Sequence, residues 1–124
     1  MSKAQSKVLI VEDDLVQSFL LETVFSSLGF SIVGKVTTGA GAIELAQLHR
    51  PDIISMDIML DDDIDGIDAA KEIQKFLKTK LIYVSGNKDQ YTLKRASETD
   101  YCCFFQKPLL LDELKKVLNE LVED

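Results

Sequence analysis

The chain has few basic residues and no long apolar run. It contains 14 Lys and Arg against 21 Asp and Glu, which gives a net charge of −7 in 124 residues. Nucleic-acid surfaces need clustered Lys and Arg, so this balance argues against nucleic-acid binding and favours cations and protein partners. The apolar runs are too short to cross a bilayer, and residues 1–5 do not begin a signal peptide. We therefore expect no membrane association.

Cysteine and histidine are also scarce, with two of the former and one of the latter. Cys102 and Cys103 are adjacent in an expected buried strand, so we interpret them as two reduced core thiols of a cytoplasmic protein. His49 stands at the expected end of a helix, where a histidine most often caps carbonyls or faces solvent. We therefore expect no disulfide, no cysteine-ligated metal and no phosphohistidine in this chain.

Short apolar runs, typical of strands buried on both faces, alternate with helix-like segments from end to end. No repeat or low-complexity linker interrupts them. The alternation predicts one α/β domain over residues 1–124, with a core of about 6–122 and a parallel sheet covered by helices on both faces. The expected strands are residues 8–11, 31–36, 52–57, 81–85 and 101–105.

Helical spacing of apolar residues marks the five segments that follow the strands. The fourth of these, at about 88–98, is poorly apolar and is expected to form a mobile, exposed face. The first expected helix is 15–28, with Val16, Phe19, Leu20 and Val24 at helical spacing, and the second is capped by Thr37 or Thr38 and ends before Pro51, with Ile43 and Ala46 inward. The third is 66–77, with Ala70, Ile73 and Leu77 toward the sheet, and the fourth is about 88–98. The last is capped by Asp112 and has Leu114, Val117, Leu118, Leu121 and Val122 on one face.

Side chains capable of chemistry stand at the ends of four expected strands. Glu12 and Asp13 follow the first strand, Asp57 ends the third, Ser85 ends the fourth and Lys107 follows the fifth. In open α/β sheets, ligands bind outside the carboxyl ends of the strands, at the point where the strand order reverses. Chemistry after the first and third strands therefore favours the flavodoxin-like order 2-1-3-4-5.

The acids are suited to a hard cation. Glu12 and Asp13 would repel each other unless a cation lay between them, and Mg²⁺ takes one or two carboxylates together with water and phosphate oxygens. Asp57 would complete this set. The alternative to cation binding is that the acids after the first strand serve only to cap the following helix, through Asp14 and also Asp13. Lys107 either extends to solvent or pairs with Asp57 and then with phosphate oxygens.

In these motifs the chain resembles the receiver domain of two-component response regulators over about residues 6–122. Five motifs occur in the family's order and at its separations. They are Val8-Leu9-Ile10-Val11-Glu12-Asp13-Asp14, Met56-Asp57-Ile58-Met59-Leu60, Asp65-Gly66, Val84-Ser85-Gly86 and Lys107-Pro108.

The resemblance implies a role for each matching residue. Asp57 would be the phosphoacceptor, and Asp13, Glu12 and the backbone carbonyl of Met59 would hold Mg²⁺, for which Mn²⁺ can substitute. Ser85 and Lys107 would bind the phosphoryl group. The implied switch residues are Ser85 and Phe104, the implied cis peptide is Lys107–Pro108, and the positions that tune the phosphoryl lifetime are Met59 and Asn87.

The resemblance also implies partners. A histidine kinase or a histidine phosphotransfer protein would supply the phosphoryl group, and the chain would take it up once rather than act as an enzyme. The fourth helix, fifth strand and fifth helix would then change and bind a downstream protein. We expect a monomer or a weak homodimer whose response passes through that partner.

Three departures from the family pattern have expected effects. Asp61-Asp62-Asp63-Ile64 makes the turn before Asp65-Gly66 one residue longer and more acidic than usual, and this extra charge either strengthens cation attraction or disfavours an approaching phosphodonor. Ser85 replaces the commoner Thr, and Gly86 follows it, which widens access to Asp57. Met59 is apolar and cannot position an attacking water, so we expect a long-lived phosphoryl group.

Three other protein classes are alternatives to the receiver domain. The segment from Asp61 to Gly66, with Glu72 at the twelfth position, satisfies the EF-hand pattern for Ca²⁺, but a strand-like segment stands where the incoming helix should be. Haloacid-dehalogenase-like phosphohydrolases need a second acid where this chain has Met59. An FMN-binding flavodoxin is disfavoured, since no Ser/Thr/Gly-rich phosphate loop follows the first strand.

Overall fold

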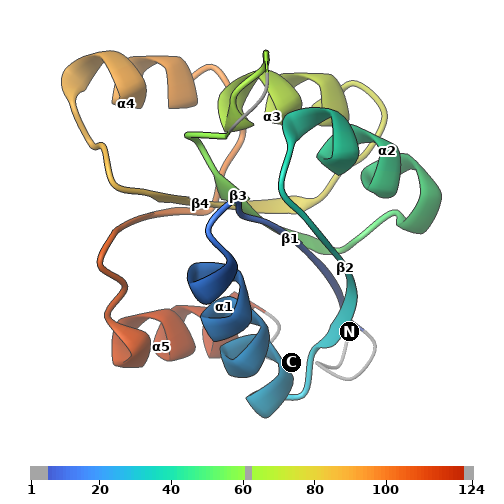
Figure 1. Ribbon diagram of the computed structural model, residues 1–124, viewed down its shortest axis with the longest axis vertical. Coiled ribbons are helices and arrows are strands. Elements are labelled where there is room, and N and C mark those ends of the chain that lie inside the picture. Colours follow the sequence, from blue (N-terminus) through green and yellow to red (C-terminus); the bar gives the residue numbers. More distant parts are fainter. Residues whose placement is uncertain (1–5, 61–62, 122–124) are drawn as a thin grey trace.

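A five-stranded parallel sheet lies between two layers of helices in the computed structural model, which describes residues 6–60 and 63–121 (Figure 1). The sheet order is β2-β1-β3-β4-β5, and every neighbouring pair is parallel, as predicted. The order reverses between β1 and β3, so a crevice is expected above their carboxyl ends. The strands are β1 (Lys7–Val11), β2 (Ser31–Val36), β3 (Ile53–Asp57), β4 (Lys80–Ser85) and β5 (Cys103–Gln106).

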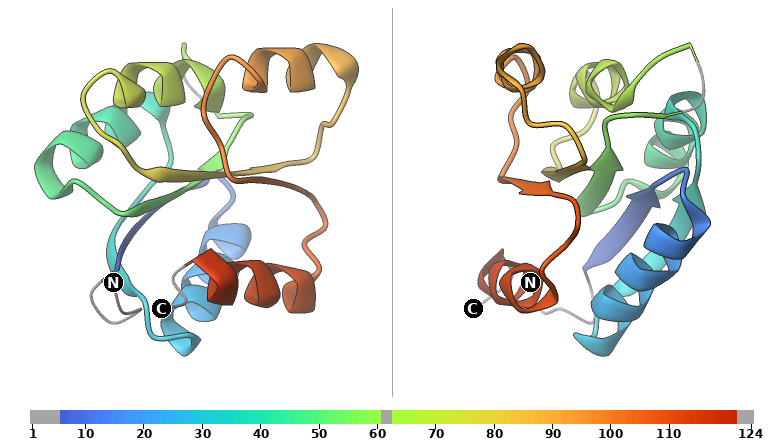
Figure 2. Two further views of the ribbon diagram at one scale, coloured as in Figure 1. Left: turned by 180° about the vertical axis from the view of Figure 1, so that it is seen from behind. Right: turned by 60° about the vertical axis from the view of Figure 1, so that its left-hand side comes forward.

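The five helices cover both faces of the sheet, again as predicted (Figures 1 and 2). α1 (Leu15–Ser27) and α5 (Leu111–Leu121) lie on one face, and α2 (Gly39–His49), α3 (Gly66–Gln74) and α4 (Gln90–Ala96) lie on the other. Each face has its own apolar core, because successive side chains of a strand point to opposite faces. None of the helices in the described ranges is long and apolar enough to cross a membrane.

The apolar face expected for α1 is partly wrong. Val16 and Phe19 are 75% and 66% exposed, whereas Leu21, Val24 and Phe25 are buried. Apolar residues occur on all sides of this helix, so their spacing alone did not identify the side that packs on the sheet. On α3, where apolar and polar residues separate cleanly, the predicted inward residues Ala70 and Ile73 are buried. α3 ends at Gln74 and not at the predicted residue 77, so Leu77, which is also buried, lies beyond the helix.

Cys102 is exposed, which contradicts its expected place in the core. β5 begins one residue later, at Cys103, and this second thiol is half-buried against the core beneath α1 and α5. β5 is an edge strand with a single neighbour, so its first residues are not enclosed as those of β3 are.

Helix caps follow the sequence at two of the three predicted positions, and Asp65 is a further cap that was not predicted. Asp14 Oδ1 accepts the backbone N–H of Val16 at 2.9 Å, and Thr38 Oγ1 accepts that of Gly41 at 3.0 Å. Asp65, whose motif precedes α3, forms a reciprocal capping box with Asp68. Asp112 is not a cap, because α5 begins at Leu111 and places Asp112 inside its first turn. α5 buries Leu114 and Leu118 and half-buries Val117 and Leu121, while Val122 lies outside the described residues.

Candidate functional site

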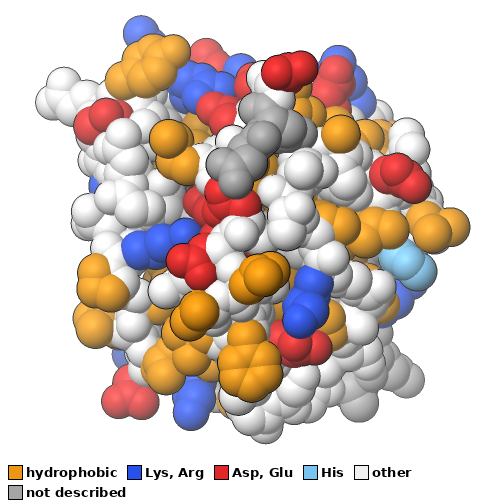
Figure 3. All heavy atoms as spheres, viewed as in Figure 1, with side chains coloured by type: hydrophobic (Ala, Val, Ile, Leu, Met, Phe, Trp, Pro, Cys, Tyr) orange, Lys and Arg blue, Asp and Glu red, His pale blue; other side chains and the backbone are white. Residues whose placement is uncertain are grey.

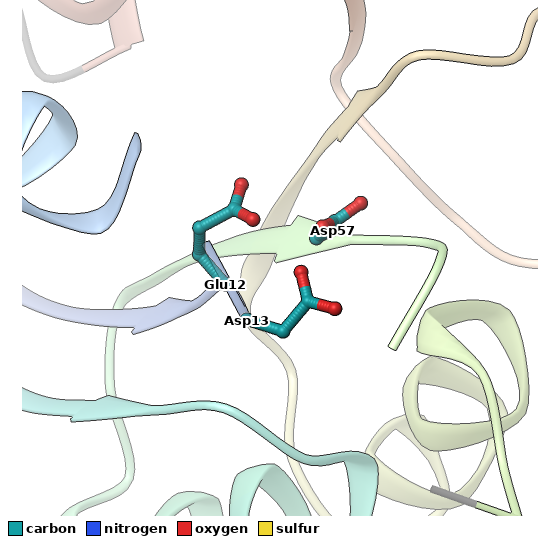
Figure 4. Close-up of side chains that lie close together, drawn as sticks. All are labelled: Glu12, Asp13 and Asp57. Atoms are coloured by element: carbon teal, nitrogen blue, oxygen red, sulfur yellow. The ribbon is translucent and has the colours of Figure 1, made fainter. Parts of the chain in front are cut away.

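Three carboxylates converge where β1 and β3 end (Figure 4). Glu12 and Asp13 follow β1, and Asp57 is the last residue of the neighbouring β3. One oxygen from each lies within 4.8 Å of those of the other two. Glu12 is 1% exposed and Asp57 3%, whereas Asp13 is only half-buried and opens the group to solvent. The topology therefore brings together the three acids that the sequence singled out.

Lys107 approaches this cluster from the end of β5. Its Nζ lies 2.9 Å from Glu12 Oε1 and 3.3 Å from Asp57 Oδ2, so it does not extend to solvent. Burial lowers the pKa of Lys107, but the hydrogen bond and charges of the two carboxylates outweigh burial and leave this pKa above its ordinary value. The Lys107–Pro108 peptide bond is cis, and Lys107 N donates to Ser85 O at 2.9 Å.

The cluster carries more negative charge than Lys107 can neutralise. Burial, together with the hydrogen bond and charge of Glu12, raises the pKa of Asp57 to about 8 despite the opposing effect of Lys107. A divalent cation would relieve this excess, and carboxylate oxygens are the donors that Mg²⁺ prefers. The donor set of Glu12, Asp13 and Asp57 therefore fits a hard cation.

Figure 3 shows acidic side chains near the middle of this face, with a blue Lys or Arg side chain beside them. Hydrophobic side chains adjoin them in the same view. The first turns of α1 contribute to the exposed apolar surface, since Leu15 and Val16 are each 75% exposed. Acidic and hydrophobic side chains therefore lie next to one another on this face of the molecule.

The backbone of Asp57 is held by the turn that leads into α3. Met59 N donates to Asp57 Oδ1 at 3.2 Å, and Gly66 N donates to Ile58 O at 2.8 Å. A Cβ at residue 66 would lie 2.1 Å from the carbonyl oxygen of Asp57, so only glycine fits there. Met59 itself is 64% exposed. The Asp65-Gly66 motif therefore has a structural reason, which is close packing on the backbone of Asp57.

Ser85 is fully buried at the end of β4, one residue beyond Val84, which pairs with Asp57. Its Oγ accepts the backbone N–H of Asn87 at 3.1 Å. A Cβ at Gly86 would meet no atom within 4 Å, so the chain leaves open space next to Ser85. The hydroxyl is thus oriented by the β4–α4 loop, and that loop does not crowd it.

Phe104 lies half-buried on β5 in an aromatic cluster. Its ring centroid is 6.0 Å from that of Tyr83 and 6.4 Å from that of Tyr101, and Lys88 Nζ lies 5.9 Å from it. The Tyr83 hydroxyl shares a buried 2.8 Å hydrogen bond with Thr99. The sequence analysis did not single out Tyr83, although its place on β4 two residues before Ser85 was a usable signal.

The sequence analysis also missed Arg95 on α4. Its Nη1 lies 2.5 Å from Asp65 Oδ2, and its Nη2 lies 3.2 Å from Asp65 Oδ1 and from Asp68 Oδ1. Burial raises the pKa of Asp65, yet the bonds from Arg95 and from the Asp68 backbone outweigh it and hold this pKa below its usual range. Nothing in the local pattern around Arg95 indicates a partner 30 residues earlier.

The EF-hand alternative does not match the geometry. The strand β3, not a helix, leads into the loop, and Asp65 and Asp68 form the cap of α3. Glu72 is exposed and its Oε2 pairs with Lys75 Nζ at 2.5 Å. Asp63 is exposed, and Asp61 and Asp62 lie outside the described residues.

Comparison with known proteins gives a consistent result. Residues 8–119 match the family described as response regulator receiver domain. The chain is 31% identical to the chemotaxis protein CheY of Thermotoga maritima, over 93% of this chain and 96% of that protein. It is 32% identical to the transcriptional regulatory protein PdtaR of Mycobacterium tuberculosis, over 87% of this chain and 52% of PdtaR, and so spans about half of that relative's length. The receiver domain of a Pseudomonas aeruginosa sensor histidine kinase, solved with magnesium coordinated in its active-site cleft, has a TM-score of 0.82 and 26% identity, with 96% of this chain and 98% of that one covered.

Proposed function

Because the chain belongs to the response regulator receiver domain family of two-component signalling, we propose that Asp57 accepts a phosphoryl group from a phosphohistidine. The donor is a histidine kinase or a histidine phosphotransfer protein. Members of this family are signalling phosphoacceptors and not classical enzymes. The observation that carries the proposal is the group of three carboxylates with Lys107 at the ends of β1, β3 and β5. We take residues 1–124 as one such domain acting in the cytoplasm.

In the proposed reaction a carboxylate oxygen of Asp57 attacks phosphorus, and the P–N bond of the donor breaks. The donor imidazole leaves with the electron pair and takes up a proton, which leaves an aspartyl phosphate on this chain. Glu12, Asp13, Asp57 and the Met59 carbonyl would hold Mg²⁺ or Mn²⁺, which supplies positive charge to the phosphoryl oxygens.

The protein's own contribution is alignment and charge. Lys107 can turn from Asp57 and Glu12 toward the new phosphoryl oxygens, since its ammonium already lies beside both carboxylates. The Ser85 hydroxyl donates to another phosphoryl oxygen. A carboxylate is a weak nucleophile, so positioning by these groups supplies most of the rate.

The response is proposed to spread from Ser85 to Phe104 and then to the surface formed by α4, β5 and α5. That surface contains an open cavity of about 450 Å³ lined by Lys88, Phe104, Lys107 and Glu113, among other residues. A downstream protein binds there, while the domain remains a monomer or a weak homodimer. Phosphorylation changes the charge at Asp57, and a local change of this kind shifts the equilibrium between two conformations of the surface formed by α4, β5 and α5.

Mass spectrometry of the intact chain tests the proposal. After incubation with Mg²⁺ and acetyl phosphate, one phosphoryl group should be added, and none should be added when EDTA removes the metal. The Asp57→Asn variant should take up none, whereas Asp63→Asn, which changes an exposed loop carboxylate, should behave as the wild type. Multiple turnovers of a phosphomonoester by the wild type would contradict the proposal.

Met59 should determine how long the phosphoryl group persists. Its exposed apolar side chain cannot orient a water toward phosphorus. Met59→Asn, which places a polar amide there, is expected to shorten the half-life of the phosphoprotein by about tenfold, because a positioned polar group can direct the attacking water. Decay of the phosphoprotein after removal of the donor measures this, and Met59→Leu should keep the wild-type lifetime. A short wild-type half-life that Met59→Asn leaves unchanged would refute the prediction.

A further inference from the structure

Two sets of ion pairs join the α4 region to α3. They are a partly buried fork from Arg95 to Asp65 and Asp68, and an exposed pair between Lys71 and Glu98, which lies just beyond α4. The first joins Arg95 to Asp65, whose side chains are 23% and 27% exposed. The second joins Lys71 Nζ to Glu98 Oε1 at 2.6 Å, with side chains that are 41% and 54% exposed. Solvent screens an exposed pair of this kind, whereas a forked guanidinium–carboxylate pair is stronger and fixes geometry.

The two carboxylates that bind the Arg95 guanidinium are also held by hydrogen bonds from backbone N–H groups. Asp65 N donates to Asp68 Oδ2 at 3.2 Å, and Asp68 N donates to Asp65 Oδ1 at 2.9 Å. Both carboxylates are therefore held by backbone N–H groups at the start of α3 as well as by Arg95. The hydrogen bonds that Arg95 donates to Asp65 raise the pKa of Arg95 further, so its charge is constant at any physiological pH.

The residue after Asp65 contacts the phosphoacceptor backbone. Gly66 N donates to Ile58 O at 2.8 Å, and the Gly66 Cα lies so close to Asp57 O that a side chain there would overlap it. Arg95, Asp65, Gly66 and Asp57 thus form a continuous series of contacts. Arg95 is joined to Asp65 by an ion pair, Asp65 to Gly66 by the peptide bond, and Gly66 to Asp57 by close packing.

We propose that Arg95 is a positioning residue for the phosphoacceptor site. Through Asp65 and Gly66 it holds the backbone that carries Asp57 and Met59, and it couples this backbone to α4 by a route that bypasses Ser85 and Phe104. The proposal rests on the proposed function of Asp57 only for its effect on phosphorylation, since metal binding is measured separately. Coupling of binding equilibria is reciprocal, so a partner that moves α4 changes metal affinity at the site.

Three variants test this inference. Arg95→Ala removes the fork, Arg95→Lys keeps the charge but cannot form the fork, and Lys71→Ala removes the exposed ion pair that also links α3 to the α4 region. Mg²⁺ affinity is measured by calorimetry without a phosphodonor, and the phosphorylation rate is measured with acetyl phosphate. Arg95→Ala should weaken Mg²⁺ binding and slow phosphorylation about three- to tenfold, which lies within the range of effects of residues that couple sites. Arg95→Lys should recover less than half of each loss, and Lys71→Ala should match the wild type within about twofold.

Amide hydrogen exchange separates positioning from a purely structural role. In the wild type, Mg²⁺ should slow exchange both in residues 57–60 and in α4. In Arg95→Ala, Mg²⁺ should still protect residues 57–60 but should no longer change exchange in α4. If Arg95→Ala proves unfolded in urea titrations, Arg95→Lys serves for all three measurements.

The outcomes distinguish the two proposals. If the Arg95 variants match Lys71→Ala in Mg²⁺ affinity and rate, or if α4 still responds to Mg²⁺ without Arg95, the inference is overturned. If the Arg95 variants lose Mg²⁺ affinity and the α4 response while even the wild type takes up no phosphoryl group, the coupling is supported and the proposed function fails.

Discussion

Asp57→Asn should stabilise the metal-free protein at neutral pH, besides ending phosphoryl uptake. The carboxyl of Asp57 is buried beside Glu12, and this burial raises its pKa from an ordinary 3.8 to about 8. Between these two values the folded protein keeps a proton that the unfolded chain releases. The free energy of unfolding therefore falls as pH rises through this interval, and the stabilising contribution of the protonated carboxyl is lost by pH 8.

The asparagine variant has no such proton to release. Its advantage over the wild type should be near zero at pH 4, should grow toward pH 8, and should then level off at roughly 2–4 kcal/mol. For a domain of this size that corresponds to roughly 10 °C in melting temperature. Mg²⁺ should reverse the order, because a ligand that binds only the folded state stabilises it, and the wild type has the better metal site.

Circular-dichroism melts in EDTA between pH 4 and pH 9, repeated with Mg²⁺, measure this prediction. The quantity to follow is the difference between variant and wild type, since other groups titrate in both proteins. Asp63→Asn is the matched control, because Asp63 is an exposed carboxylate of the neighbouring loop. An advantage of Asp57→Asn that is the same at pH 5 and pH 8 would show that burial does not hold the proton on Asp57.

Gly66→Ala should destabilise the protein by about 3–4 kcal/mol, at the upper end of the effects of overpacking. Glycine to alanine at the start of a helix would ordinarily be favourable or neutral. Here the new Cβ would lie 2.1 Å from Asp57 O and 2.9 Å from Ile58 Cα, and both contacts are with backbone. Because no side-chain rotation relieves them, either α3 or the end of β3 must move, and the 2.8 Å bond from Gly66 N to Ile58 O is lost.

Urea denaturation measures the size of this effect as a lower midpoint with an unchanged slope. Gly86→Ala is the control, since a Cβ at Gly86 meets nothing within 4 Å and should change stability by less than about 0.5 kcal/mol. The folded fraction of the Gly66→Ala variant should also be phosphorylated slowly, because the displaced backbone carries Asp57. Equal urea midpoints for the two alanine variants would rule out close packing as the reason for Gly66.

The placement of the acids was predictable because it depends on periodicity and on the rules of parallel sheets. Val8–Val11 and Ile53–Met56 are mostly apolar runs that are each followed by an acid, and strand ends in an α/β sheet meet at one edge. Glu12, Asp13 and Asp57 therefore had to lie near one another once β1 and β3 were neighbours. The same reasoning placed Lys107 at that edge.

The face of α1 and the surroundings of Cys102 could not be predicted in this way. α1 is apolar on all sides, so only the packed sheet decides that Phe25 is buried and Phe19 exposed. Cys102 follows an apolar pattern, but it precedes the start of an edge strand, where one neighbour cannot enclose it.

The sequence by itself determined the fold, the strand order and the residues gathered at the site, because strand-like periodicity and strand-end chemistry are local signals. Only the tertiary structure decided how those residues are paired. It placed Lys107 nearer to Glu12 than to Asp57, set Gly66 against the backbone of Asp57, and brought Arg95 to Asp65 across 30 residues. These contacts depend on the distances between packed elements, and no spacing along the chain encodes those distances.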